Sequence, residues 1–422
     1  MPTGIDMTIS RTTRAALAGA AVLFAGTSLS AQAPADATLA PVLSAIKADQ
    51  AWTLDQQKSI CEIAAPPFHE QTRAAAMKRR FESLGLSARI DAVGNVIAER
   101  PGVASGPTVV LAGHLDTVFP EGTDVSVKEK DGKLYGPGIG DDCRGLATVL
   151  TVAREYQRQK VRTAGTVIFV ADVGEEGAGN LRGMHQLFEK EYVGKIDYFI
   201  SVDDAGLGIA SRAVGSHRYH VTYHGPGGHS YGAFGIPNPI HALGRAIAGI
   251  ADIQVPRTPK TTFNVGVIEG GTSVNSISAS GSMDIDMRSE SAEELNKVDA
   301  KVRAILSQAL EAENARWPGE KARLTMTIDT IGIRPTGAQA DCAKIVRTAV
   351  DAAAALGFKT RTGASSTDAN IPISMGIPGI RIGGGGDQAG AHSLGEWYQD
   401  TPDSYMGPQW AALIVARLAG VR

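Results

Sequence analysis

The chain has 422 residues, 43% of them hydrophobic and 20% charged, and its formal net charge is −3. Its length favours two or three domains, its composition is that of a soluble globular protein, and its charge offers no basic surface for nucleic acid. The cysteines Cys61, Cys143 and Cys342 lie far apart and form no C-x-x-C pair, which argues against a disulfide framework and a thiolate zinc site.

The N-terminal segment has the pattern of a secretory signal peptide. Arg11 and Arg14 precede an apolar run over residues 15–25, and an A-x-A cleavage pattern follows at residues 31–33. The alternative is a single membrane anchor, but the apolar run is shorter than the roughly 20 residues that a spanning helix needs. We therefore expect residues 1–33 to be a signal peptide, the mature chain to have no stable membrane span, and the protein to be periplasmic or secreted.

Helical and strand patterns alternate over residues 34–213, which we expect to form the first part of an α/β catalytic domain. Residues 108–112, 166–171 and 198–202 are short apolar runs, typical of strands that are buried on both faces. Each run is followed by acidic or imidazole residues. Ligands bind at the carboxyl ends of strands in open α/β sheets, so these strand ends are candidate positions for a site.

The pattern changes over residues 214–330. Four segments alternate apolar and polar residues with period two, as half-buried strands do, near residues 219–223, 263–267, 283–287 and 324–328. Helical spacing separates the first strand from the second and the third from the fourth, and Ser291 with Glu294 forms a plausible capping box before the second helix. The order β-α-β-β-α-β predicts a ferredoxin-like domain inserted into the α/β domain, which resumes over residues 331–422.

Two polar residues follow the first buried strand, in the segment "AGHLDTVFP" at residues 112–120. Because a strand alternates faces with period two, His114 and Asp116 point the same way. Two ligand-type groups at a strand end suggest a metal site. The pair by itself is equally consistent with two side chains that merely hydrogen-bond each other at the end of a strand.

Four further segments decide between these interpretations, because each places acidic or imidazole groups at a strand end or in a glycine-rich loop. They are "GPGIGDDCRG" (136–145), "VGEEG" (173–177), "VDDAG" (202–206) and "GAHSLGEW" (390–397). Burying adjacent carboxylates is costly unless cations neutralise them, and a pair of divalent ions resolves that cost. Imidazole and carboxylate without thiolate suit Zn²⁺ in an open catalytic site, with Co²⁺ or Mn²⁺ as replacements.

The order of these motifs resembles the di-zinc exopeptidase family of peptidase T, glutamate carboxypeptidase and the aminoacylases, with peptidase T-like members nearest. The resemblance implies a mixed-sheet di-zinc hydrolase domain with an inserted dimerisation or lid domain, and two zinc ions per subunit. It implies that Asp141 bridges both ions, that His114 and Asp203 complete the first site, and that Glu176 and His392 complete the second.

The resemblance also implies roles for residues around the metals. Asp116 would orient His114, Glu175 would be the general base, and the Asp141–Asp142 peptide bond would be cis. In the inserted domain, His229 of "GPGGHS" would reach a neighbouring active site and stabilise the oxyanion. The alternative for His229 is an exposed histidine at a strand end.

The resemblance also places substrate contacts in the inserted domain. The resemblance assigns Asn275 of "GGTSVNS" and Arg288 of "DMRS" to the carboxylate or carbonyl groups of the substrate. Arginine has a planar fork that suits a carboxylate, although Arg288 is equally consistent with an ion pair on the domain surface. The loop at residues 365–372 is a further candidate for lining the substrate pocket.

The expected activity is hydrolysis of a terminal amide bond in a small peptide, by metal-activated water with Glu175 as the general base. The first alternative is an amidohydrolase that acts on N-acyl amino acids, since related chains use the same metal residues. The second is an exported solute-binding protein, which predicts a cleft without a metal cage. The exposed sheet edge of the inserted domain and the resemblance both predict a homodimer.

Overall fold

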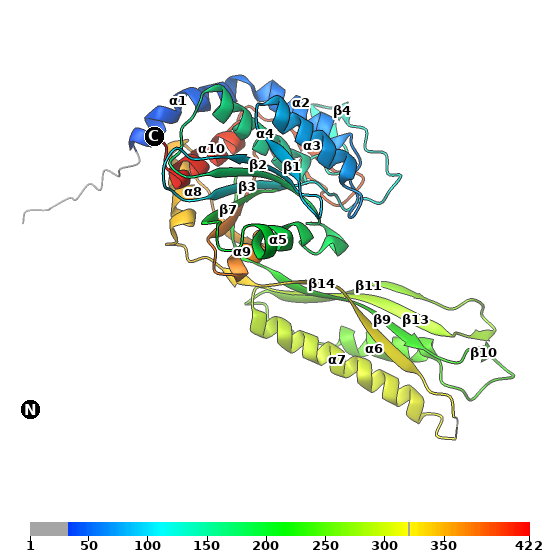
Figure 1. Cartoon of the computed structure of the whole chain (residues 1–422). Coiled ribbons are helices and arrows are strands. Elements are labelled where there is room, and N and C mark those ends of the chain that lie inside the picture. Colours follow the sequence, from blue (N-terminus) through cyan, green and yellow to red (C-terminus); the bar gives the residue numbers. More distant parts are fainter. Residues whose placement is uncertain (1–32, 320) are drawn as a thin grey trace, which may run out of the picture.

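The computed structural model describes residues 33–319 and 321–422 (Figure 1). The signal peptide expected at residues 1–33 therefore falls outside the described residues, apart from its last position. In the described part of the chain, no helix is long and apolar enough to cross a membrane.

The larger domain is built on a nine-stranded mixed sheet. Its strand order is β1-β2-β6-β3-β7-β17-β8-β15, with β16 paired to β8. The strands are β1 (Ala88–Ile90), β2 (Val96–Arg100), β3 (Val109–His114), β6 (Val167–Asp172), β7 (Tyr198–Val202), β8 (Ile209–Ala213), β15 (Gly337–Ala338), β16 (Thr362–Ser365) and β17 (Gly379–Ile382). The central strands β6, β3, β7 and β17 are parallel neighbours, whereas β1, β2 and β15 pair antiparallel. The predicted mixed α/β class is confirmed.

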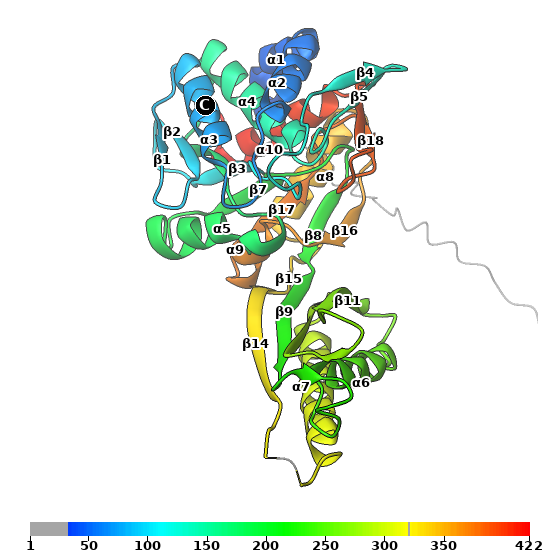
Figure 2. The same cartoon turned by 90° about the vertical axis from the view of Figure 1, so that its right-hand side faces the viewer.

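Helices cover both faces of this sheet (Figures 1 and 2). One face carries α1 (Ala33–Ala48), α2 (Gln50–Cys61), α3 (Gln71–Ser83), α4 (Cys143–Arg158), α8 (Lys344–Ala355) and α10 (Met406–Ala419). The other carries α5 (Arg182–Gln186), the following turn Leu187–Glu191 and α9 (Asn370–Ser374). Strand β3 shows the reason, because Val109 and Leu111 belong to the first core and Val110 and Ala112 to the second. A strand buried on both faces has no polar side to show.

A small four-stranded sheet lies beside the carboxyl ends of the central strands. It has the order β18-β19-β5-β4, with β18 (Asp387–Ala389), β19 (Trp397–Gln399), β5 (Lys133–Tyr135) and β4 (Lys128–Lys130). Through the pairing of β19 with β5, the segment that carries His392 is held next to the loop that carries Asp141. Two parts of the site that are far apart in sequence are thereby brought together.

The inserted domain has the predicted order of elements. It consists of β9 (Gly215–His224), α6 (Pro239–Ala251), β11 (Thr261–Gly270), β13 (Ser280–Ser289), α7 (Ala292–Ala315) and β14 (Thr325–Arg334). The strands form an antiparallel sheet with the order β11-β13-β9-β14, and both helices pack on one of its faces. This is the ferredoxin-like arrangement expected from the alternation of residues. Strand β14 continues to Arg334, into the larger domain (Figure 2).

The expected capping box at α7 is half formed. Ser291 Oγ accepts a hydrogen bond from the Glu294 amide at 3.3 Å, as an N-cap should. The amide of Ser291 donates instead to Ser289 Oγ, at 3.0 Å. A serine two residues upstream therefore satisfies the donor that Glu294 was expected to satisfy.

Candidate metal centre

His114 is the last residue of β3, and its ring is 1% exposed. Nδ1 lies 3.0 Å from the main-chain oxygen of Asp116, and Nε2 lies 3.0 Å from Asp141 Oδ1. A carbonyl oxygen can only accept, so Nδ1 carries the proton and the lone pair of Nε2 is left for a metal ion. The group that orients the ring is thus the main chain of Asp116 and not the carboxylate that the resemblance implied, whose Oδ1 is 3.9 Å from Nδ1.

The carboxylate of Asp116 holds the loop that carries both glutamates. It accepts hydrogen bonds from the amides of Gly174, Glu175 and Glu176 at 2.9, 3.1 and 2.8 Å. The loop turns sharply at Gly174, whose φ of 77° is a conformation that favours glycine. Asp116 therefore sets the positions from which Glu175 and Glu176 reach the site.

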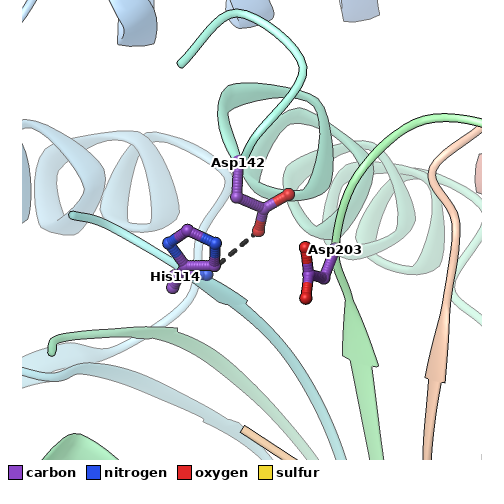
Figure 3. Close-up of side chains that lie close together, drawn as sticks. All are labelled: His114, Asp142 and Asp203. Carbon is purple, nitrogen blue, oxygen red and sulfur yellow. Dashed lines mark hydrogen bonds between the residues drawn. The ribbon is translucent and has the colours of Figure 1, made fainter. Parts of the chain in front are cut away.

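Asp141 and Asp142 point in different directions. The peptide bond between them is cis, as expected. Asp142 caps α4, because its Oδ1 accepts from the Gly145 amide at 2.9 Å. Its Oδ2 accepts from the amide of His114, at the end of β3, at 3.0 Å. Figure 3 shows Asp142 between His114 and Asp203. Its oxygens are already engaged with the main chain, whereas those of Asp141 face imidazoles.

Asp141 occupies the centre of the cluster. Its Oδ1 faces His114, and its Oδ2 lies 3.0 Å from Nε2 of His392. Nε2 of His392 is also 3.1 Å from Glu176 Oε1. Potential ligand atoms lie within 4.8 Å of one another in four groups of the described residues, two of which contain Asp141: Asp141–Glu176–His392, Asp141–Asp203–Asp204, His114–Asp142–Asp203 and His114–Glu175–Glu176. This is the geometry expected if Asp141 bridges two ions.

The donor set fits divalent metal ions. The carboxylates of Asp141, Glu176 and Asp203 are buried, and burial together with the adjacent Asp204 raises the pKa of Asp203 to about 7. Hydrogen bonds to Asp141 and Glu176 raise the pKa of His392 to about 11. The negative charge thus draws protons when no metal ion neutralises it, and imidazole with carboxylate is a donor set that zinc accepts.

Glu175 forms an ion pair with Arg334, an arginine that the sequence patterns did not single out. Burial raises the pKa of the Glu175 carboxyl well above its usual range, and Arg334 opposes this rise. Nη1 of Arg334 donates to Glu175 Oε1 at 2.9 Å and to Ser366 Oγ at 3.1 Å, and Nη2 donates to the Glu175 main-chain oxygen. Arg334 ends β14, 159 residues along the chain from Glu175. No local sequence pattern could predict an ion pair between residues so far apart in the chain.

Glu396 is a second residue with a role that was not assigned from the sequence. Its carboxylate accepts hydrogen bonds from the amides of Gly138, Gly140 and Asp141, at 2.9, 2.8 and 3.0 Å. It therefore fixes the glycine-rich loop that presents Asp141. The signal was present in the motif "GAHSLGEW", which contains both His392 and Glu396.

A pocket of about 220 Å³ opens above the cluster. Its acidic side holds the carboxylates already described, and its basic side is formed by Arg218 and Arg288 of the inserted domain and by Arg334 at the end of β14. Ser365 and Ser366, from the loop considered for the substrate pocket, also line it. Arg288 therefore reaches the pocket, although its Nε also pairs with Asp286 Oδ2 at 2.7 Å.

His229 and Asn275 lie away from this pocket. They belong to a small two-stranded sheet, β10 (Gly228–His229) with β12 (Ser276–Ile277), or to the loop before it, at the far end of the inserted domain (Figure 1). Both side chains are exposed, and Nδ1 of His229 accepts from the amides of Tyr231 and Gly232 at 3.2 Å. Within one chain they do not join the site, so the roles that the resemblance implied for them would require a second subunit.

The α/β fold and the cluster of imidazole and carboxylate ligands define the class: this is a metal-dependent hydrolase. Residues 110–414 match the model of peptidase family M20/M25/M40, and the chain belongs to this family. The predicted resemblance is thereby confirmed at the level of the family.

Relatives and solved structures agree with this assignment. The chain is 24% identical to an uncharacterized protein of Bacillus subtilis, YqjE, over 79% of this chain and 90% of that protein. It is 27% identical to acetylornithine deacetylase of Shigella sonnei over 58% and 66% of the two chains. Similar structures include a Staphylococcus aureus tripeptidase (TM-score 0.68, 21% identity, 87% and 98% coverage) and human carnosine dipeptidase 1 (TM-score 0.69, 15% identity, 90% and 99% coverage). At these identities the two structures establish the fold.

Proposed function

We propose that this protein is an exported, zinc-dependent peptidase that hydrolyses a terminal amide bond of small peptides, with Glu175 as its general base. The observation that carries the proposal is that Asp141 lies between two groups of ligand atoms while Glu175 lines the same pocket. The names of the similar structures, a tripeptidase and a dipeptidase, support a small peptide as substrate.

The residues present would hold two ions. Asp141, Glu176 and His392, whose ligand atoms form one group, would bind one ion. His114, Asp141 and Asp203 would bind the other, since Asp203 groups with His114 and with Asp141, and Asp141 Oδ1 faces His114. Bound divalent ions supply a Lewis acid that acidifies water and polarises an amide carbonyl.

Side chains of the protein would transfer the protons and hold the reacting groups in place. Glu175 would take a proton from the attacking water and return it to the leaving amine. Arg334 engages Oε1 of Glu175, which leaves Oε2 for the water and keeps the carboxylate in one orientation. Arg288 would hold the carboxylate of the substrate at the other side of the pocket.

An amidohydrolase acting on N-acyl amino acids remains the second candidate, because acetylornithine deacetylase is among the relatives. The solute-binding alternative is set aside, since it predicts no metal cage and the chain belongs to a family of hydrolases.

A comparison of substrates on defined metal forms tests the proposal. The mature protein, stripped with a chelator and reloaded with Zn²⁺, Co²⁺ or Mn²⁺, is assayed with dipeptides, tripeptides and N-acetyl amino acids. Hydrolysis that depends on the metal and is fastest for the peptides is the expected result. Faster cleavage of N-acetyl amino acids would favour the second candidate, and no hydrolysis of any amide in any metal form would overturn both.

A further inference from the structure

A second pocket, of about 300 Å³, continues from the first along the junction of the two domains. The two pockets share Arg288, Ser365 and Ser366. The second pocket adds Lys260, Thr262 and Glu290, which come from the inserted domain. A substrate whose amide bond lies over the metal ligands therefore has a continuous path past Arg288 toward Lys260.

The register of the inserted sheet explains why these side chains share one face. Thr262 of β11 lies opposite Arg288 of β13, and the Glu290 amide donates to the Lys260 main-chain oxygen at 3.3 Å. Lys260 and Glu290 are each two residues from that pair, so their side chains leave the sheet on the same side. The intervening Thr261 and Ser289 are buried on the other side. The register of β11 against β13 therefore fixes the position of Lys260 beyond Arg288.

The charges in this pocket are not balanced. Glu290 is paired with Arg212, whose Nε lies 3.3 Å from its Oε2. Arg288 is paired with Asp286, which also accepts from Arg218 Nε at 2.9 Å. No carboxylate pairs with Lys260 in the described part of the chain.

Three hydroxyl side chains line the same pocket as this exposed, unpaired cation. Thr262, Ser365 and Ser366 all line the pocket and offer O–H groups. The pocket thus holds an ammonium group, hydroxyl donors and one carboxylate, that of Glu290, which is already paired with Arg212. Such a pocket fits an anionic ligand, and the anion that a peptide supplies is a carboxylate.

Building on the proposed function, we propose that this second pocket receives the leaving residue of the substrate and that Lys260 binds its side-chain carboxylate. Arg288 lines both pockets and therefore lies nearer the reacting bond, where the main-chain carboxylate of a leaving residue is found. Lys260 lies about 7 Å farther along the sheet, two strand residues away, where only a side chain reaches. The enzyme therefore prefers substrates whose leaving residue is aspartate or glutamate.

The test uses the full-length zinc-loaded enzyme and three matched substrates: alanyl-glutamate, alanyl-glutamine and alanyl-glutamate with an amidated C-terminus. We expect kcat/KM for alanyl-glutamate to exceed that for alanyl-glutamine by about 10- to 100-fold, the worth of one hydrogen bond to a charged group. Lys260→Met should reduce alanyl-glutamate to the level of alanyl-glutamine and leave alanyl-glutamine nearly unchanged. Lys301→Met, on the exposed side of α7, is the matched control and should alter neither.

Reversing the charge at position 260 provides an independent test, because it should create a preference for a basic leaving residue. Lys260→Glu should lower kcat/KM for alanyl-glutamate and raise it for alanyl-lysine. Equal rates for the glutamate and glutamine substrates, or a preference that survives Lys260→Met, would overturn the assignment of Lys260. If amidation of the C-terminus abolished the cleavage of alanyl-glutamate while Lys260→Met left it unchanged, the anion that is bound would be the main-chain carboxylate, held by Arg288. That result would also overturn the assignment of Lys260.

Binding of the free amino acids separates this inference from the proposed function. Glutamate and glutamine are titrated into the wild-type and Lys260→Met enzymes by calorimetry. Tighter binding of glutamate that depends on Lys260 supports the pocket even if no peptide is cleaved. Peptide hydrolysis without any preference for glutamate, in binding or in rate, refutes the pocket and leaves the proposed function standing.

Discussion

Glu175 and Glu176 are neighbours in the chain with different partners, and this difference favours Glu175 as the base and Glu176 as the ligand. Both glutamates belong to a potential ligand group with His114, but Oε1 of Glu176 also lies 3.1 Å from His392, whereas Oε1 of Glu175 accepts from Arg334. In the proposed mechanism Glu176 would bind the ion and Glu175 would be held beside it. Substitutions that keep the shape and remove the charge distinguish the two roles.

Glu175→Gln should fold, retain two metal ions and lose about 10²–10⁴-fold in kcat, the usual range for a general base. Glu176→Gln should instead lose metal from one site. Metal content by mass spectrometry and steady-state kinetics measure both effects. The reverse result would exchange the two roles, and unchanged kcat in both variants would refute the proposed mechanism.

Asp116 acts on the metals through the loop at residues 174–176. Asparagine keeps one accepting oxygen but turns an NH₂ group toward main-chain donors, so Asp116→Asn should loosen the loop. We expect about 10–100-fold lower activity or metal affinity. His114→Ala, which removes a ligand, should lose more metal than Asp116→Asn, because the main chain of residue 116 still holds the His114 ring in the latter variant. Equal metal loss in the two variants would contradict this.

Metal binding should release protons. With no metal bound, Asp141 and Glu176 raise the pKa of His392 to about 11, so its imidazole is protonated at pH 7. A metal ion binds only the neutral ring, so about one proton per chain should leave from His392 as the second site fills, and metal affinity should fall as the pH is lowered. Calorimetric titration of Zn²⁺ in two buffers of different ionisation enthalpy measures the release. Identical heats in the two buffers would contradict the prediction.

At the scale of elements, α7 stabilises the inserted domain without reaching the pocket. It packs on the face of the sheet opposite to the one that carries Arg288, and Ser291 caps its first turn. Ser291→Ala should therefore lower the free energy of unfolding by about 1 kcal/mol, with kcat unchanged.

Urea denaturation followed by circular dichroism measures this loss. Ser307→Ala, at an exposed position inside the same helix, is the control and should be neutral or slightly stabilising, because alanine is the better helix former. A drop in activity for Ser291→Ala at full folding would show that α7 does more than support the sheet.

For the whole molecule, one edge of the inserted domain's sheet carries exposed apolar side chains. Strand β11 is an edge of the sheet, and its Val267 and Ile268 are exposed. Unpaired strand edges invite pairing with another chain, so we predict a homodimer in which His229 of one subunit serves the site of the other.

Complementation tests this arrangement. Glu175→Gln and His229→Ala should each be inactive alone. A mixed dimer has one site with both residues intact, so unfolding and refolding an equal mixture should restore about a quarter of wild-type activity. A monomer by light scattering at micromolar concentration with full activity, or no recovery on mixing, would refute the shared site.

The sequence by itself predicted the elements and the candidate metal site, because local patterns indicate both. Period-two alternation placed the four strands of the inserted domain. Acidic or imidazole residues after buried strands marked the positions of a candidate site, and the resemblance pointed to His114, Glu176 and Asp203 as ligands. The parallel order of β6, β3 and β7 then brings these strand ends to one edge of the sheet. Burial of adjacent charges, which needs cations, was enough to indicate metal ions.

Only the tertiary structure decided which groups hold the ligands in place. The Asp116 carboxylate binds the loop at 174–176 and not the ring of His114, and Arg334 reaches Glu175 from the last residue of β14. Neither could be derived from spacing, because a hydrogen bond between distant segments depends on where two strand ends and a domain junction finally meet. Alternation and turn chemistry act over a few residues, whereas the contacts that orient a site are set by the packing of the whole chain.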